Sequence, residues 1–451
     1  MKKFLFASTA AIIFTTGSAG AADVAPRMHV KARPIAYYDW TGFYVGGYAG
    51  IGVNRSHGFD PTGSDDGALN FLGTGFTGGG TAGYNWQFGP NWFAGIEGDF
   101  GYLGLSHDVQ QYNESFSTNS KTSWIGTVRG RLGYTNGPSL RYITGGVAWV
   151  NLEDTVSNLS GSASVSSSKT QTGYAFGSGV ETMLGGNWTA KAEYLFVDVG
   201  DGDTVTNTVV SRTVQTDKHR YHLQRFGLNY LFGNKPQPPL AASNWSGFYA
   251  GIVGGSAVAQ ARVTDPTGSN AGEFGNNGSG YTVGGLLGYN WQFAPAWVAG
   301  IEGDFSWLGI DHGVDDYNDS LALYTLKTSW IGMLRGRVGY STGPALLYVT
   351  GGGAWVSVDE SWDFGSGPVS STKTLSGYTV GGGIETMLAG NWTSRTEYLY
   401  VDVGDSNTLN DPSDTPVRAN HQFHLFRSGL TYRFGDLGKG PVGKGPVVTR
   451  Y

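Results

Sequence analysis

The stretch Arg225-Phe226-Gly227-Leu228-Asn229-Tyr230-Leu231-Phe232 decides the fold, and Arg427-Ser428-Gly429-Leu430-Thr431-Tyr432-Arg433-Phe434 is its near-copy. At the period of a β-strand, the apolar and aromatic side chains at even positions of the first stretch share one face, while Arg225, Gly227 and Asn229 share the other. A strand with one apolar and one polar face suits a wall between lipid and a polar interior. The sequence therefore predicts a membrane-spanning β-strand at the end of each half of the chain.

Composition agrees with an all-β membrane protein. The 451 residues include 74 Gly, 14 Trp, 25 Tyr, 23 Phe and no Cys. Gly is poor in helix interiors and aromatic residues favour pleated surfaces, so helices are disfavoured. After the first residues no apolar run reaches the ~18 residues that a spanning helix needs, and strands would have to cross the membrane. With 14% charged residues and a net charge of −6, nothing indicates a nucleic-acid partner.

The N-terminus predicts export from the cytoplasm. Lys2 and Lys3 precede the mostly apolar run 4–14, and Ala19-Gly20-Ala21 offers a small-residue cleavage site. We interpret residues 1–21 as a secretory signal peptide and residues 22–39 as a periplasmic N-terminal segment. Because an exported chain without Cys has no disulfides, strand pairing must hold the fold together.

An internal repeat divides the rest of the chain. Trp40-Thr-Gly-Phe-Tyr corresponds to Trp245-Ser-Gly-Phe-Tyr, and Gly95-Ile-Glu-Gly-Asp-Phe100 returns as Gly300-Ile-Glu-Gly-Asp-Phe305. Between the copies, Lys235-Pro-Gln-Pro-Pro239 favours an extended spacer because proline donates no ladder hydrogen bond. The predicted organisation is unit 1 at 40–233, a Pro-rich linker at 234–244, unit 2 at 245–435 and a C-terminal tail at 436–451.

Each unit contains eight strand candidates, joined alternately by long polar loops and short turns, as outer-membrane barrels require. In unit 1 these candidates are residues 40–53, 73–88, 92–105, 121–134, 140–151, 168–183, 188–199 and 218–232. The predicted fold is all-β: two tandem eight-stranded, transmembrane, antiparallel up-and-down barrels. A single merged sixteen-stranded barrel is the alternative. Eight strands enclose little more than side chains, whereas sixteen leave an aqueous channel.

Aromatic side chains beside the short turns predict a girdle at the lipid–water boundary. In unit 1 these residues are Trp40, Trp86, Trp92, Tyr134, Trp188 and Phe232.

Strand parity sorts the charged residues onto the face opposite the apolar one, so that acids and bases lie together in the barrel interior. Solvated faces of a soluble sandwich are the other interpretation. In unit 1 the predicted interior charges are Glu97, Asp99, Arg129, Arg131, Glu181, Lys191 and Glu193. In unit 2 they are Glu302, Asp304, Arg335, Arg337, Glu385, Arg395 and Glu397.

The chain resembles the small outer-membrane immunogenic protein family of Gram-negative bacteria. The resemblance is carried by the signal peptide, the Trp-Thr-Gly-Phe-Tyr opening, the segments Gly83-Tyr-Asn-Trp-Gln87 and Gly95-Ile-Glu-Gly-Asp99, and the aromatic closing strand. That family is porin-like and related to the OmpA membrane domain. The resemblance implies localisation in the cell outer membrane, contact with outer-membrane lipid and lipopolysaccharide, and assembly by the barrel-assembly machinery. This chain departs from the family in being duplicated. The assembly signal would comprise Arg225, Gly227, Tyr230, Phe232, Arg427, Gly429, Tyr432 and Phe434.

Catalytic and metal-binding signals are weak. His222 and His424 occupy matched positions but have no nucleophile motif beside them, which favours surface or girdle histidines. The segment Asp198-Val-Gly-Asp201-Gly-Asp203 lacks the later ligands of a calcium loop. We expect no enzymatic activity, no metal and no cofactor.

Three functions remain open from the sequence. The first is a structural outer-membrane protein that supports membrane integrity and displays surface loops. The second is a diffusion porin for small solutes, formed by a merged barrel. The third is a secreted soluble β-sandwich such as a lectin, to which Gly, Trp and alternating strands are also natural.

Overall fold

The computed structural model describes residues 38–59, 68–111, 116–158, 160–209, 211–233, 240, 243–265, 272–315, 322–364, 368–410 and 416–435. Residues Tyr37–Tyr451 belong to one compact unit. The predicted signal peptide, the tail 436–451 and most of the segment 22–39 and of the linker lie outside the described residues, so those predictions stay predictions. Within the described part of the chain, no helix is long and apolar enough to cross a membrane.

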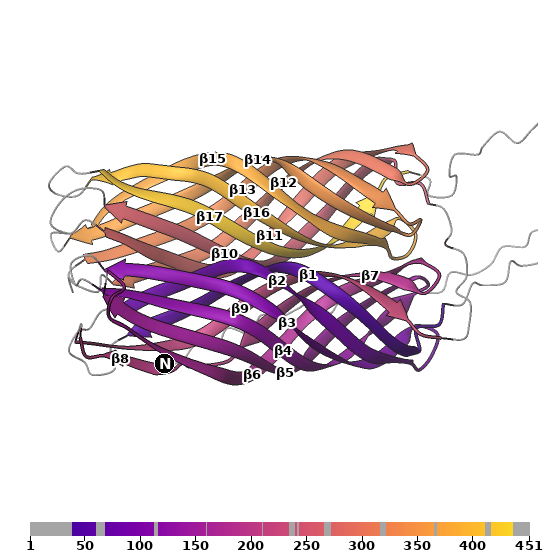
Figure 1. Ribbon diagram of the computed structural model, residues 1–451. Coiled ribbons are helices and arrows are strands. Elements are labelled where there is room, and N and C mark those ends of the chain that lie inside the picture. The colour runs from indigo at the N-terminus through magenta and orange to yellow at the C-terminus, as the bar shows by residue number, and fades with distance from the viewer. Residues whose placement is uncertain are drawn as a thin grey trace, which may run out of the picture. The chain divides into compact units, whose positions relative to one another are not determined.

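The described residues form antiparallel strands in two sets (Figure 1). The first set is β1 (Gly42–Phe59), β2 (Ala68–Gln87), β3 (Trp92–Gln111), β4 (Phe116–Asn136), β5 (Ser139–Asn158), β6 (Ser164–Gly185), β7 (Trp188–Asp198), β8 (Thr204–Asn207) and β9 (Arg212–Leu231). The second is β10 (Gly247–Asp265), β11 (Gly272–Ala294), β12 (Trp297–Asp315), β13 (Ala322–Ser341), β14 (Ala345–Phe364), β15 (Pro368–Met387), β16 (Trp392–Asn410) and β17 (Pro416–Arg433).

Each set closes on itself. The first strand β1 pairs with the last strand β9, with Tyr44 opposite Leu231, and β10 pairs with β17 in the same way, with Tyr249 opposite Arg433. Because β7 and β8 both pair with β9, they are two parts of one interrupted strand, and each barrel has eight strands. The fold prediction of two eight-stranded barrels is confirmed, and the merged sixteen-stranded alternative is wrong because each closing strand finds its partner within its own half.

The strands extend further from the short turns than predicted. β1 runs to Phe59 and β3 to Gln111, whereas the predicted strands ended at Val53 and Leu105. About ten tilted residues suffice to cross the hydrocarbon layer. The outer parts of the hairpins therefore need no apolar face, and hydropathy alternation gives no signal there.

Alternation along the strands places apolar side chains outside and charges inside. Ile96 and Phe100 on β3 are 57% and 62% exposed, whereas Glu97 between them is fully buried. Five of the six predicted girdle residues of unit 1 are exposed, as a girdle requires: Trp86, Trp92, Tyr134, Trp188 and Phe232.

Trp40 contradicts its predicted place in the girdle. Its side chain is 1% exposed, and its indole Nε1 donates a hydrogen bond to the Gly137 carbonyl 3.2 Å away. It packs with Tyr38, Phe93 and other apolar residues of the barrel base. The N-terminal segment before β1 thus folds across the turn-side end, because a buried indole needs both an apolar contact and an acceptor.

Candidate functional site

A ring of buried ion pairs occupies the interior of the first barrel. Glu97 on β3 accepts hydrogen bonds from Arg129 on β4 (2.7 Å), from Lys191 on β7 (2.9 Å) and from the Tyr44 hydroxyl on β1 (2.7 Å). Arg129 also donates to Glu193 Oε2 at 3.0 Å. One carboxylate therefore links four strands across the barrel, and all these charged side chains are almost completely buried.

The ring continues with the remaining charges of this half. Arg131 contacts Glu181 at 2.8 Å and lies with its guanidinium 4.0 Å from the centroid of the Tyr142 ring. Asp99 accepts from Arg129 at 2.8 Å and from Arg225 at 2.9 Å. Burying such charges is tolerated only when each has opposite charges and hydrogen bonds around it.

The second barrel repeats the ring. Glu302 accepts from Arg335 and from Arg395, the latter at 2.7 Å, and Tyr249 donates to it at 2.8 Å. The other members contact one another in the same way: Arg337 with Glu385, Arg335 with Glu397 and Asp304, and Arg427 with Asp304 and Glu397.

Arg225 and Arg427, which the sequence predicts only as part of the assembly signal, are also members of the ring. Both are buried, and each contacts an aspartate of its own barrel, Asp99 or Asp304. With them, the described ring of each barrel contains four acids and four bases, and its formal charge is zero. The parity of Arg225 already placed it on the polar face, so the signal was present in the sequence.

Apolar layers lie on both sides of the ring. The turn-side layer of the first barrel contains Tyr38, Trp40, Phe93, Leu140 and Met183, and Leu240 of the linker packs against it. Its counterpart in the second barrel contains Trp245, Val298 and Leu346. The layer on the far side of the ring is a larger set of buried residues. In the first barrel it includes Leu103, Leu105, Ile125, Val150, Leu195 and Leu223, and in the second Leu308, Ile310, Ile331, Val356, Leu399 and Leu425.

A second polar contact, which the sequence analysis missed, lies beyond that layer. In the first barrel the Thr216 hydroxyl donates to Asp154 Oδ2 at 2.7 Å and lies 3.0 Å from His219 Nε2. Asp154 belongs to β5 and the other two residues to β9, so the contact ties separated parts of the wall together. We name this carboxylate–hydroxyl–imidazole group the outer tie.

The second barrel has the same outer tie built from other positions. The Ser406 hydroxyl donates to Glu360 Oε1 at 2.8 Å and lies 3.0 Å from His421 Nε2. Ser406 corresponds in the repeat to Gly202, and Thr216 corresponds to Arg418. The hydroxyl thus lies on β9 in the first barrel and on β16 in the second. Aligning the two repeats therefore does not reveal the outer tie.

The remaining assembly-signal residues line the closing strands. Tyr230 packs edge-on against Trp188 and Phe232, and Tyr432 packs against Trp392 and Phe434 in the same way. At Gly227 a Cβ would lie 3.1 Å from the Gly47 carbonyl oxygen, so this position favours glycine. These contacts describe where the residues lie, and their role in assembly stays a prediction.

His222 and His424 are buried, at 7% and 3% exposure, so the expectation of exposed surface or girdle histidines is wrong. Each Nδ1 lies 2.8 Å from a tyrosine hydroxyl, that of Tyr194 or of Tyr398. These tyrosine–histidine pairs lie on the outward faces of the barrels.

The acidic segment that superficially resembles a calcium loop has ordinary protein partners. Asp203 accepts from Lys169 and from Ser167, both at 2.9 Å, and Asp198 contacts Arg220 at 3.2 Å. Among the residues that the structure describes, no group of three or more His, Cys, Asp or Glu could hold a metal ion.

Both barrels match one family model. The model described as "Outer membrane protein beta-barrel domain" matches residues 14–232 and again 231–434. The chain belongs to this outer-membrane β-barrel family. It is therefore an outer-membrane protein whose two halves each carry one family barrel.

Named relatives agree. The chain is 35% identical over 244 residues to a 31 kDa outer-membrane immunogenic protein of Brucella melitensis biotype 1, covering 51% of this chain and 100% of the relative. It is 37% identical over 170 residues to a 22 kDa outer membrane protein of Rhizobium leguminosarum bv. viciae, covering 37% of this chain and 67% of the relative. The resemblance to outer-membrane immunogenic proteins is confirmed.

Among solved structures, the attachment invasion locus protein Ail of Yersinia pestis is 15% identical, with a TM-score of 0.24. The likeness covers 43% of this chain and 99% of Ail.

Proposed function

We propose that this protein is a structural, non-catalytic component of the outer membrane, in which two plugged barrels support envelope integrity and carry loops at the cell surface. The observation that carries the proposal is the filled interior. A neutral ring of ion pairs lies between two apolar layers in each barrel, and closed eight-stranded barrels have room for little else.

Planar-bilayer recording tests the proposal. A porin reconstituted in parallel serves as the positive control. We expect the purified full chain to give no steady conductance steps under conditions in which the porin conducts. Regular, long-lived steps would overturn a plugged interior.

A mutant strain without the protein should become more sensitive to detergents and large antibiotics, and the wild-type gene should restore resistance.

Strand direction supports the proposed display of the long connections at the cell surface. The connection 60–67 joins β1 to β2 at the end opposite the short turns, and short turns face the periplasm in outer-membrane barrels. An epitope tag inserted in 60–67 should be labelled by antibody on intact cells. A tag in the turn Gly89-Pro90-Asn91 should be labelled only after the outer membrane is permeabilised. The reverse pattern would show the opposite orientation.

The closing strands are proposed to engage the barrel-assembly machinery. Their terminal aromatics, Phe232 and Phe434, are about half exposed and therefore available for recognition. Deleting Phe232 or Phe434 should reduce the membrane-inserted fraction, whereas Phe88→Ala, at an exposed aromatic beside another short turn, should not. Equal insertion of all three variants would contradict an assembly role.

Contact with lipid and lipopolysaccharide is proposed for the outward face. Exposed apolar residues such as Ile96 and Leu132 would face acyl chains. The exposed Lys218 and Lys327, which pair with Asp217 and Asp311, would exchange these carboxylates for anionic headgroups. Replacing both lysines with glutamine should weaken co-purification of lipopolysaccharide. Unchanged co-purification would exclude these two cations as its ligands.

A further inference from the structure

Arg141 on β5 points away from the interior of the first barrel, in a row with the exposed Ile143. A charge on the lipid face of a barrel is unfavourable, although less so near the membrane boundary. The guanidinium finds its partners on the second barrel: Nε donates to Ser394 Oγ at 2.6 Å, and Nη2 donates to Thr386 Oγ1 at 2.5 Å. The outward face around Arg141 is thus covered by protein.

The repeat provides a second copy of this contact with different chemistry. Leu347 occupies the position of Arg141 in the second barrel, and Ala190 occupies that of Ser394 in the first. Leu347 and Ala190 belong to one apolar cluster. An arginine therefore faces a hydroxyl on one side, and a leucine faces an alanine on the other. The two repeats have diverged in a complementary way.

Equivalent residues of the two barrels also belong to shared buried clusters. Val180 and Ile384 occupy the same repeat position and share one buried cluster, and so do Val53 and Val258 in another. Contact between equivalent positions is the mark of an interface related by a two-fold axis, in which the same patch is used by both partners.

The tyrosine–histidine pairs lie in this covered region. The Tyr194 hydroxyl, already bonded to His222, also donates to Ser256 Oγ of the second barrel at 3.2 Å. The His222 ring stacks on Phe426 with centroids 5.9 Å apart. Polar groups that face outward in a membrane protein find partners in neighbouring protein, because lipid offers none.

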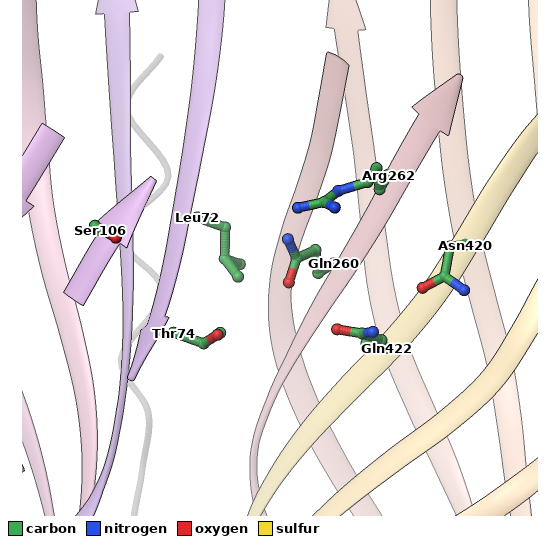
Figure 2. Close-up of a pocket in the computed structure, with 7 residues that line it drawn as sticks. All are labelled: Leu72, Thr74, Ser106, Gln260, Arg262, Asn420 and Gln422. Carbon is green, nitrogen blue, oxygen red and sulfur yellow. The ribbon is translucent and has the colours of Figure 1, made fainter. Parts of the chain in front are cut away.

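The contact continues towards the outer ends of the barrels. Arg55 on β1 donates to Ser279 Oγ on β11 at 3.3 Å. Their repeat equivalents, Gln260 and Thr74, both line a hollow of about 240 Å³ (Figure 2). The hollow is also lined by Leu72, Ser106, Arg262, Asn420 and Gln422.

We propose that the two barrels of one chain dock about a pseudo-two-fold axis. The docking faces are the outward faces of the closing strands β9 and β17 and of the surrounding strands, as far as β5 in the first barrel and β14 in the second. The occupant of each face is the other barrel of the same chain. Two arguments favour it over a second copy of the protein. The linker raises the effective concentration of the tethered barrel, and the divergence of Arg141 from Leu347 makes the two faces complementary to each other.

Disulfide trapping tests this docking, because the natural chain has no cysteine to interfere. Val180→Cys and Ile384→Cys place one thiol on each barrel at the proposed axis. Val128→Cys and Leu334→Cys form the matched control, since they are also equivalent to each other but are 46% and 52% exposed. Both variants carry a protease site in the linker and are oxidised in the membrane. Heat-dependent gel mobility verifies that each barrel is folded.

After linker cleavage, the 180/384 variant should run at full length on a non-reducing gel and as two halves after reduction. The 128/334 variant should run as halves in both lanes. Halves from the oxidised 180/384 variant would overturn the proposal. So would a product of two full chains before cleavage, which would show that a second copy occupies the face.

Variants of Arg141 and Ser394 test whether the two repeats have diverged in a complementary way. In the cleaved wild type the two halves should co-elute in mild detergent. Arg141→Leu removes the guanidinium that donates to the Ser394 and Thr386 hydroxyls, which are then left only with each other. It should reduce the co-eluting fraction severalfold. The double variant Arg141→Leu/Ser394→Ala recreates the leucine–alanine contact of the other side and should restore most of it. Undiminished co-elution of the Arg141→Leu halves, or no recovery in the double variant, would overturn the role given to this pair.

Discussion

The two barrels reach the same outer tie by different routes. In the first, the hydroxyl belongs to Thr216 on the same strand as His219, and in the second it belongs to Ser406 on the neighbouring strand. The carboxylate changes too, from Asp154 to the longer Glu360. The ring of ion pairs differs far less between the barrels, with Lys191 replaced by Arg395. Both barrels therefore keep the same kinds of interior polar groups in contact, even where the residues at single positions differ.

The largest expected effect concerns the ring. Glu97→Ala would leave Arg129, Arg131 and Lys191 with one carboxylate fewer in a dry interior. Breaking a buried ion pair in this way costs about 3–5 kcal/mol. The free energy of unfolding of the full chain in lipid vesicles, measured with guanidinium, should fall by that amount. Glu302→Ala should do the same in the second barrel, and a difference between the two would show that the rings are not equivalent.

The next effect tests the two versions of the outer tie. A Cβ at Gly202 would lie 2.1 Å from the Thr216 hydroxyl oxygen, so Gly202→Ser should destabilise the first barrel by about 1–3 kcal/mol. Gly202→Ser/Thr216→Ala imitates the second barrel and should recover most of the loss. Hydrogen exchange of the outer part of β9 provides the measurement. A double variant no better than the single one would mean that the hydroxyls are not interchangeable.

A smaller effect is expected from exchanging the one base that differs in the ring. Arg395 reaches both Glu302 (2.7 Å) and Glu385 (3.4 Å), whereas the amine of Lys191 contacts Glu97. Arg395→Lys should lose the long contact with Glu385 and cost about 1 kcal/mol, the typical net contribution of one intramolecular hydrogen bond. Lys191→Arg should be close to neutral. Denaturant midpoints of the two variants measured side by side check this asymmetry, and equal losses would refute it.

The smallest effect is expected at the exposed Lys169–Asp203 pair of the first barrel. Its side chains are 56% and 32% exposed, and such pairs contribute at most ~1 kcal/mol. Hydrogen bonds from Lys169 and Ser167 hold the pKa of Asp203 below its usual value. Lys169→Ala should raise that pKa, measurable by carbon NMR titration, and leave stability nearly unchanged. The small stabilisation by this pair is present above the ordinary aspartate pKa and is lost as the pH falls. An unchanged pKa would contradict this assignment.

Strand parity and the alternation of long loops and short turns were enough to predict outer-membrane strands with one face towards lipid, because successive side chains of a strand point to opposite faces. The same parity placed Glu97 and Arg129 together on the inward face. Parity did not predict contacts between side chains that are distant in the sequence and meet only in the folded barrel. Trp40 lies next to a turn in sequence but folds inward, and the outer ties depend on side chains that meet across the interior.

The merged barrel could not be excluded from the sequence, because hydropathy does not reveal which strand pairs with the first. Only the register of β1 with β9 and of β10 with β17 decides it. The outer ends of the strands were missed for a related reason, since above the lipid both faces can be polar.

Self-closure of each half also bears on gene organisation. Neither barrel borrows a strand from the other, and the first and last strands of each half begin and end at the turn side. The order of the halves along the gene is then free to change: a permuted coding sequence, with 245–435 ahead of 40–233 and a spacer of similar reach, should yield the same pair of cylinders.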